Sequence, residues 1–263
     1  MKSSKAFSEP SSKTALKPGN TVRLNKFIAE AGICSRRHAD ELILAGKVSV
    51  NSVVMTELGT MIDPAKDKVF CDGKALQKQA FIYLMINKPK GYTVTKEDEF
   101  KRPTVYNLLP KELRVCNYAG RLDKDTEGLL LLTNDGDMIQ ALSHPKMRVE
   151  KVYKADINQV LGRRQIEELR SGVVIEGKKT YPAGVFVKKS DDGRSTLKIV
   201  ISEGRKRQVR LMIEAVGAKV ISLKRLQYGP LKLGEMLAGE YRYLTRGEIK
   251  TLKMIKEKGL PQK

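Results

Sequence analysis

The sequence predicts an α+β protein with two domains and a polyanionic partner. Its strand-like and helix-like segments do not follow a regular βαβ rhythm, and this pattern favours the α+β class. The chain of 263 residues is 41% hydrophobic, which is enough to bury a sizeable core. Its 50 Lys and Arg exceed its 30 Asp and Glu, and the net charge of +20 favours a nucleic acid as the partner.

The charge excess is uneven along the chain. Residues 1–20 contain four Lys, one Glu and five Ser without apolar periodicity, so we expect a flexible basic arm. Residues 21–75 are nearly neutral, with eight basic and seven acidic side chains, whereas residues 76–263 carry 38 basic and 22 acidic ones. The larger part of the chain is therefore the larger polyanion binder, and we place the domain boundary at residues 77–79.

The small domain, residues 21–75, is predicted to consist of two helices packed on a small sheet. Apolar residues recur at helical spacing over residues 24–31. Ser35 is the expected N-cap of a second helix, which ends before Gly46. Valines on either side of a polar turn in residues 48–54 are typical of a short hairpin.

The larger domain, residues 81–245, combines strand and helix patterns. We expect strands over residues 81–86, 128–133 and 195–202. Residues 207–216 have the apolar spacing of an amphipathic helix. Residues 246–263 are expected to form a basic tail with a short, fraying helix.

Composition excludes several classes of protein. The longest apolar run, residues 80–86, is far shorter than a membrane span, and the first residues lack the apolar stretch of a signal peptide. We therefore expect a soluble, cytoplasmic protein. Cys34, Cys71 and Cys116 have no Cys-x-x-Cys spacing and the chain has only two His, so neither a disulfide framework nor a zinc site is expected.

Basic residues cluster in the small domain. Arg36 and Arg37 open its second helix, and Arg23, Lys26 and Lys47 lie nearby in sequence. A helix amino terminus with a basic cluster favours phosphate binding, although ordinary solvated surface charges have the same composition.

The local sequence around these residues adds a resemblance. The segments RLNKFI (23–28), CSRR (34–37) and GKVSVN (46–51) resemble the S4 RNA-binding domain, with Ser52 where that domain usually has Gly. The resemblance implies that the small domain binds RNA through these basic residues.

The densest motif of the chain is GRLDKDTEGLLLLTNDG, residues 120–136. An acidic turn that leads directly into a four-Leu strand fixes Asp123 at the rim of a rigid element, where a catalytic group needs to be. A polar turn with solvated acids is the ordinary alternative. A calcium loop is excluded because Asn134 stands where a bidentate Glu is required, so no metal is expected.

This motif closely resembles the signature of the RsuA/RluB-type pseudouridine synthases, in which the Asp of GRLD, here Asp123, is the essential catalytic residue. Further segments resemble the other motifs of that family: NKPKG (87–91), RPTV (102–105), SHP (143–145), EKVY (150–153) and ISEGRKRQVR (201–210). With the S4-like part, the resemblance covers residues 22–245. It implies a pseudouridine synthase catalytic domain with a mixed, mainly antiparallel sheet and flanking helices.

Pseudouridine formation breaks the bond from uracil N1 to the ribose, turns the base and joins its C5 to the same sugar carbon. No redox or phosphoryl transfer step occurs, so no cofactor is expected. Asp123 would act as a nucleophile toward C1′ or as a base on a ribose proton, and the sequence leaves both routes open. An acid in a closed pocket stays ionised where a cation lies close. Arg210, in the motif whose basic residue pairs with the catalytic Asp, is the expected partner.

The resemblance also assigns the remaining site residues. Tyr153 is expected to stack on the uracil and to help deprotonate C5. Because the target base must leave its stack, Arg121 is expected to fill the vacated position or to grip a phosphate. Arg205 and Arg207 complete the predicted RNA-binding set. A plain core role for Tyr153 and a plain surface charge for Arg210 are the ordinary alternatives.

The leading hypothesis is an RNA pseudouridine synthase that modifies a structured stem-loop of ribosomal RNA, as a monomer, on free RNA or on a ribosome-assembly intermediate. The segments RPTV (102–105) and YGPL (228–231) look more like the RluB branch, which favours large-subunit (23S) RNA. The alternatives are small-subunit (16S) RNA as the target, a non-catalytic RNA-binding assembly factor, and nonspecific DNA binding.

Overall fold

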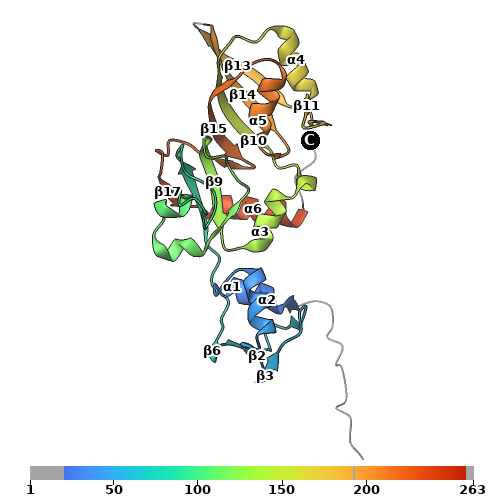
Figure 1. Cartoon of the computed structure of the whole chain (residues 1–263), viewed down its shortest axis with the longest axis vertical. Helices are drawn as coiled ribbons and strands as arrows, with labels where there is room; N and C mark the ends of the chain where they lie inside the picture. Colours follow the sequence, from blue (N-terminus) through green and yellow to red (C-terminus); the bar gives the residue numbers. More distant parts are fainter. Residues whose placement is uncertain (1–20, 192, 259–263) are drawn as a thin grey trace, which may run out of the picture. The chain divides into compact units, whose positions relative to one another are not determined.

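The computed structural model describes residues 21–191 and 193–258 (Figure 1). The chain divides after Gln79 into two compact units. We call them the small unit, up to Gln79, and the large unit, from Ala80 onward. The predicted basic arm over residues 1–20 lies outside the described residues.

The small unit contains two helices and two small sheets. Its helices are α1 (Leu24–Glu30) and α2 (Arg36–Leu44). A four-stranded antiparallel sheet has the order β3-β2-β5-β6, and β1 pairs with β4. The strand bounds are β1 (Val22–Arg23), β2 (Val48–Val50), β3 (Val53–Met55), β4 (Met61–Ile62), β5 (Val69–Cys71) and β6 (Lys74–Ala75).

Local chemistry explains these elements. The Oγ of Ser35 accepts a hydrogen bond of 3.2 Å from the backbone N–H of His38, so the predicted N-cap of α2 is confirmed. Apolar residues of both helices, among them Phe27, Ile28 and Ile43, are buried against Val48 of the sheet. The predicted arrangement of two helices on a small sheet is therefore confirmed.

The turn between β2 and β3 carries an unfavourable side chain. Asn51 and Ser52 join the paired residues Val50 and Val53 with φ angles of 50° and 71°. A two-residue hairpin turn with positive φ at both positions suits the right-handed twist of the strands, and Asn tolerates that conformation. Ser does so at a cost, because its Cβ crowds the backbone in the left-handed region.

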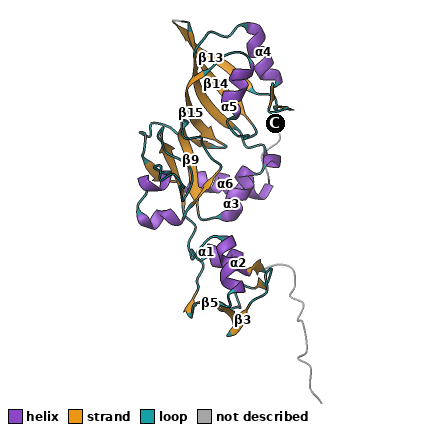
Figure 2. Ribbon diagram, in the orientation of Figure 1, coloured by secondary structure: helices purple, strands orange, loops and turns teal. Residues whose placement is uncertain are grey.

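The large unit is built on a nine-stranded sheet with the order β13-β14-β10-β15-β9-β7-β17, to which β16 and β8 are added beside β15 and β9. Its strands are orange in Figure 2, where β13, β14, β15 and β9 are labelled. Only β15 and β9 pair in parallel among the described strands; the other pairs of this sheet are antiparallel. The predicted mixed, mainly antiparallel sheet is confirmed. The bounds are β7 (Tyr83–Lys88), β8 (Asn117–Ala119), β9 (Glu127–Thr133), β10 (Lys151–Ile157), β13 (Gly184–Asp191), β14 (Arg194–Ile201), β15 (Val220–Tyr228), β16 (Leu231–Lys232) and β17 (Tyr241–Tyr243).

Helices cover both faces of this sheet. They are α3 (Gly136–Ser143), α4 (Arg163–Ser171), α5 (Gln208–Ala215) and α6 (Arg246–Lys258), with the short 3₁₀ helices η1 (Val105–Leu108), η2 (Lys111–Val115) and η3 (Pro145–Met147). The hairpin of β11 (Val174–Ile175) and β12 (Lys178–Lys179) lies apart from the main sheet. None of the helices within the described ranges is long and apolar enough to cross a membrane.

The central strands are buried on both sides. Leu130 and Leu132 of β9 belong to one core with α5, and Leu129 and Leu131 belong to a second core with α3 and α6. Because successive strand residues point to opposite faces, the uninterrupted run of leucines reflects a strand covered on both faces.

Strand β7 begins and ends two residues later than the apolar run predicts. Phe81 is exposed, whereas the polar residues Asn87 and Lys88 are buried and continue the ladder opposite Leu129 and Gly128. A prediction from hydrophobicity stops at Ile86 because it assigns buried polar side chains to a loop.

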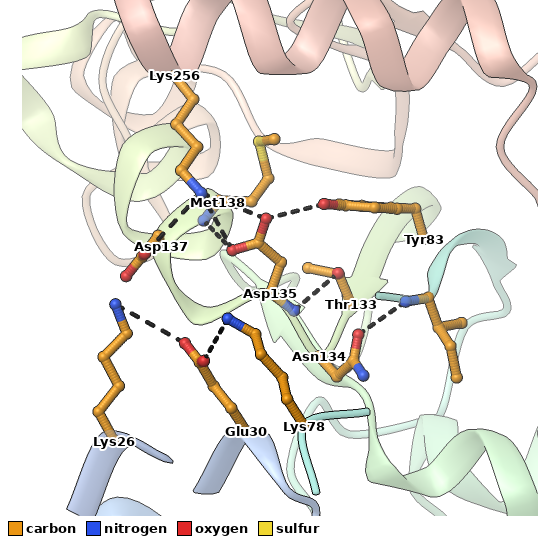
Figure 3. A network of polar contacts seen from close by, with 11 residues as sticks. Lys26, Glu30, Lys78, Tyr83, Thr133, Asn134, Asp135, Asp137, Met138 and Lys256 are labelled. Atoms are coloured by element: carbon orange, nitrogen blue, oxygen red, sulfur yellow. Dashed lines mark hydrogen bonds and ion pairs between the residues drawn. The ribbon is translucent and has the colours of Figure 1, made fainter. Parts of the chain in front are cut away.

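The carboxy-terminal segment is part of the large unit rather than a separate tail. Leu252 and Ile255 of α6 are buried in the second core. Asp135, only 3% exposed, accepts hydrogen bonds from the Tyr83 hydroxyl at 2.8 Å and from the N–H of Met138, and it pairs with Lys256 of α6 at 3.3 Å (Figure 3). One buried carboxylate thus caps α3 and connects it to β7 and α6.

Replacing Ser52 with Gly should stabilise the β2–β3 hairpin. Gly adopts positive φ without steric cost, and after its larger unfolded-state entropy is subtracted the expected gain is about 1 kcal/mol in the free energy of local opening. Hydrogen–deuterium exchange of the β2 and β3 amides in the full chain measures it. The control is Ser49→Gly, inside β2, which should speed exchange. Faster exchange in Ser52→Gly would contradict the turn assignment.

Candidate active site

A pocket of about 410 Å³ opens in the large unit. It is lined by the loop after β8, the start of β10, the segment between β14 and α5, and the last part of β15. Seven Lys or Arg but only two carboxylates, Asp123 and Glu203, are among its described lining residues. A cleft with this charge balance attracts anions.

Asp123 lies in the loop between β8 and β9, half-buried at the pocket wall. The loop is tightly turned, because the backbone carbonyl of Asp123 accepts a hydrogen bond of 3.0 Å from the N–H of Thr126. Gly128 follows with φ of 109° and lies so close to the backbone of Arg225 that a Cβ there would clash with the Arg225 carbonyl. A glycine is thus required where this loop enters the sheet.

Lys88 connects this loop to the NKPKG segment. The side chain is fully buried, and its ammonium donates to the backbone carbonyls of Pro89 at 2.9 Å, Tyr92 at 2.8 Å and Lys124 at 3.1 Å. Burial lowers the pKa of Lys88 to about 8, while the carboxylates of the Asp123 loop act in the opposite direction. The Lys88 ammonium therefore holds the backbone of Lys124, the residue that follows Asp123.

Arg210 reaches the same loop from α5. It is 8% exposed, and its Nη2 donates to the backbone carbonyl of Asp125 at 3.0 Å. Burial and the nearby Arg207 lower the pKa of Arg210, whereas Asp123 and Asp125 raise it. Among the described residues no direct ion pair joins Arg210 to Asp123, and Arg210 is not in the pocket lining. The guanidinium thus acts on Asp123 from a distance, which differs from the direct pairing that the sequence predicts.

Tyr153 lies in the pocket wall on β10 and is almost completely buried. Its cross-strand neighbours are Ile199 on one side and Arg225 on the other. A flat, rigid side chain in this position offers a surface on which a planar base can stack.

The predicted RNA-binding residues of the large unit have two different environments. Arg121 and Arg207 line the pocket and are exposed to solvent. Arg205 also lines the pocket, but its guanidinium donates to the backbone carbonyls of Lys178 at 2.9 Å and of Ile175, so it fastens the β11–β12 hairpin. The structure leaves Arg121 and Arg207 freer than Arg205 to bind a phosphate.

In the small unit, four of the five predicted residues are exposed: Arg23, Arg36, Arg37 and Lys47. Arg36 and Arg37 form the first turn of α2, where the helix dipole favours an anion. Lys26 is half-buried and pairs with Glu30 at 3.7 Å (Figure 3).

Lys151, Arg225 and Tyr228 line the pocket but are not among the predicted site residues. One signal was available, because Lys151 precedes Tyr153 by two positions and therefore shares its face of the strand. Arg225 and Tyr228 have no local signal, since their burial depends on neighbours from distant strands.

Replacing Lys88 with Met should loosen the Asp123 loop. The change removes the shared donor of three backbone carbonyls, so we expect a loss of about 3 kcal/mol in the free energy of unfolding. Amides of residues 120–126 should exchange faster with deuterium. Lys90→Met changes an exposed lysine of the same segment and serves as the control. A Lys88→Met protein as stable as the control would contradict the anchoring role.

Comparison with known proteins identifies families for both units. The chain matches the family model of RNA pseudouridylate synthase over residues 82–215 and that of the S4 domain over residues 22–69. It is similar to a solved structure, the crystal structure of a pseudouridylate synthase, with a TM-score of 0.64 and 33% identity; the match covers 88% of this chain and 99% of the other.

Two proteins of Bacillus subtilis (strain 168) are similar over nearly their whole length. The uncharacterized RNA pseudouridine synthase YtzG is 40% identical over 234 residues, 88% of this chain and 98% of that protein. Ribosomal large subunit pseudouridine synthase B is 38% identical over 239 residues, 90% of this chain and 98% of that protein. The pocket, its aspartate and these similarities lead to one conclusion: the chain belongs to the RNA pseudouridine synthase family and carries an S4 domain in its amino-terminal part.

Proposed function

We propose that this pseudouridine synthase isomerises a specific uridine of large-subunit ribosomal RNA. The similarity to ribosomal large subunit pseudouridine synthase B, which extends over 98% of that protein, supports this class of target. An S4 domain with exposed arginines on α2 and a net charge of +20 supports a structured RNA as the substrate.

The observation that carries the proposal is a half-buried carboxylate, Asp123, in a pocket whose other charged groups are almost all cations. A purely RNA-binding surface has no use for such an acid, because a carboxylate repels phosphate. A non-catalytic assembly factor is therefore the weaker alternative.

Asp123 would act at the sugar. As a nucleophile it attacks C1′ while the C1′–N1 bond breaks; as a base it removes a ribose proton. Both routes require the ionised acid. Lys88 and Arg210 donate hydrogen bonds to backbone carbonyls of the Asp123 loop and not to the carboxylate of Asp123. Both carboxylate oxygens therefore stay available for the reaction.

Tyr153 would hold the base while it turns. Stacking on a phenol ring fixes the plane of the uracil but allows rotation within that plane. The target nucleotide has to leave its stack to reach this wall, and the exposed Arg121 beside Asp123 would contact the extruded nucleotide or its phosphate.

Asp123→Asn should abolish conversion without weakening RNA binding. The amide keeps the size of the side chain but is neither a nucleophile nor a base, so the single-turnover rate should fall by about 10³-fold or more, with the Kd for RNA within about twofold. The control is Asp125→Asn in the same loop, because Arg210 contacts Asp125 through its backbone carbonyl, which the substitution keeps.

Mapping pseudouridine in ribosomal RNA from a deletion strain identifies the target. We expect one large-subunit uridine to lose its modification and to regain it with the wild-type protein but not with Asp123→Asn. Loss of a small-subunit site would overturn the proposed target, and an unchanged map with intact RNA binding would favour the assembly factor.

A further inference from the structure

Two cations at the pocket wall have no ionic partner in the described part of the chain. Arg225 is 2% exposed; its Nε donates to the Leu129 carbonyl at 2.7 Å, and its buried Nη2 has no hydrogen-bond partner among the described residues. The ammonium of Lys151 donates to the Val149 carbonyl at 2.8 Å. Both side chains line the pocket.

These two cations contact the same aromatic ring. The Lys151 Nζ is 5.6 Å and the Arg225 Cζ 5.0 Å from the centre of the same Tyr228 ring. Burial and the charge of Arg225 lower the pKa of Lys151 to about 8, and Glu203 opposes that shift only in part. The pair repels, so its placement costs free energy that the carbonyls and the Tyr228 ring, being uncharged, offset without neutralising either cation.

Packing does not explain this arrangement. Apolar residues of similar volume would fill the same space without the cost of desolvating two charges. A buried donor without a partner in a native protein is uncommon and calls for an acceptor that the chain itself does not supply. A negative charge in the pocket would offset the repulsion between the two cations.

The position of the pair indicates which part of the ligand it meets. Lys151 shares its face of β10 with Tyr153, and Tyr153 stands directly opposite Arg225 in the β10–β15 ladder. A uracil stacked on Tyr153 would therefore lie at the same pocket wall as both cations. Backbone phosphates suit the exposed rim better, where Lys206 and Arg207 remain in contact with water.

We propose that Lys151 and Arg225 form a subsite for the uracil base that stabilises the negative charge the base acquires when its glycosidic bond breaks. The inference rests on the proposed isomerisation of uridine. When C1′–N1 breaks, the electron pair stays with N1 and spreads to O2 and O4. When C5 then bonds to C1′, C5 releases its proton and N1 gains one, so no atom or electron is gained or lost.

This subsite acts mainly on the rate. The neutral uracil of the bound substrate interacts weakly with the two cations, whereas the departing anion interacts strongly. Removing one cation should therefore slow the reaction at saturating enzyme more than it weakens RNA binding.

The test compares Lys151→Met with wild type on substrate RNA that carries uridine or 5-fluorouridine at the target. Fluorine makes the departing base a more stable anion, so 5-fluorouridine depends less on the cations. We expect the single-turnover rate with uridine to fall about 10²-fold. C5 of 5-fluorouridine has no proton to release, so its consumption is measured instead of pseudouridine formation. The rate at which the target 5-fluorouridine is consumed, followed by chromatography of the digested RNA, should fall at least tenfold less. Lys151→Arg should restore part of the uridine rate, and the Kd for RNA should stay within about twofold.

Two variants keep the comparison interpretable. Lys154→Met makes the same change on the same strand at an exposed position paired with Asp156, and it should match wild type with both RNAs. Lys151→Gln keeps a donor for the Val149 carbonyl without the charge and takes the place of the Met variant if that one does not fold.

The outcomes separate the two proposals. Equal slowing with both bases would overturn the subsite, as would a raised Kd with an unchanged saturating rate, which indicates a phosphate contact. If the wild-type protein converts no ribosomal RNA, the proposed function fails. A wild type that converts it, with variants that do not distinguish the two bases, overturns only this inference.

Discussion

Cations bonded to backbone carbonyls hold the loop on which the chemistry of this protein depends. Lys88 donates to the carbonyl of Lys124 and Arg210 to that of Asp125, the two residues that follow Asp123. A carbonyl is neutral, so it does not cancel the positive charge of either cation. That charge favours the ionised form of an acid nearby, here Asp123. A direct ion pair would instead occupy the oxygens that must reach the sugar.

The sheet arranges these groups in one row. Lys88 ends β7 opposite Gly128 of β9; Gly128 is paired with Arg225 of β15, and Arg225 is paired with Tyr153 of β10. Four adjacent strands thus place Lys88, which holds the Asp123 loop, beside Gly128, where that loop enters the sheet. The buried Arg225 and the ring of Tyr153 follow in the next two strands. The ladder hydrogen bonds between these four strands fix the spacing of the row before RNA binds.

The cations of the large unit differ in how far their side chains are exposed to solvent, and this exposure determines their role. Exposed cations such as Arg121 and Arg207 remain hydrated, attract RNA over a distance and are screened by salt. The buried Arg225 and the half-buried Lys151 have lost part of their hydration and act more strongly at short range. Glu203 helps organise this wall, since its carboxylate accepts from the N–H of Tyr181 at 2.9 Å and from Gln208 at 2.7 Å.

The sequence by itself determined the elements whose signal is local: the helices α1, α2 and α5, the cap at Ser35, and the leucine strand that follows the Asp123 motif. Periodicity and caps depend on residues within a few positions of each other, so no tertiary contact is needed to find them. Tertiary structure alone decided that β7 extends to a buried Lys88 and that α6 packs through Lys256 onto Asp135. It also decided that Arg225 is a buried cation with no counter-ion among residues 21–191 and 193–258. A charged residue on a strand is ordinarily exposed. Only neighbours brought together from distant parts of the chain can bury it, and the free energy of that burial is absent from any local pattern.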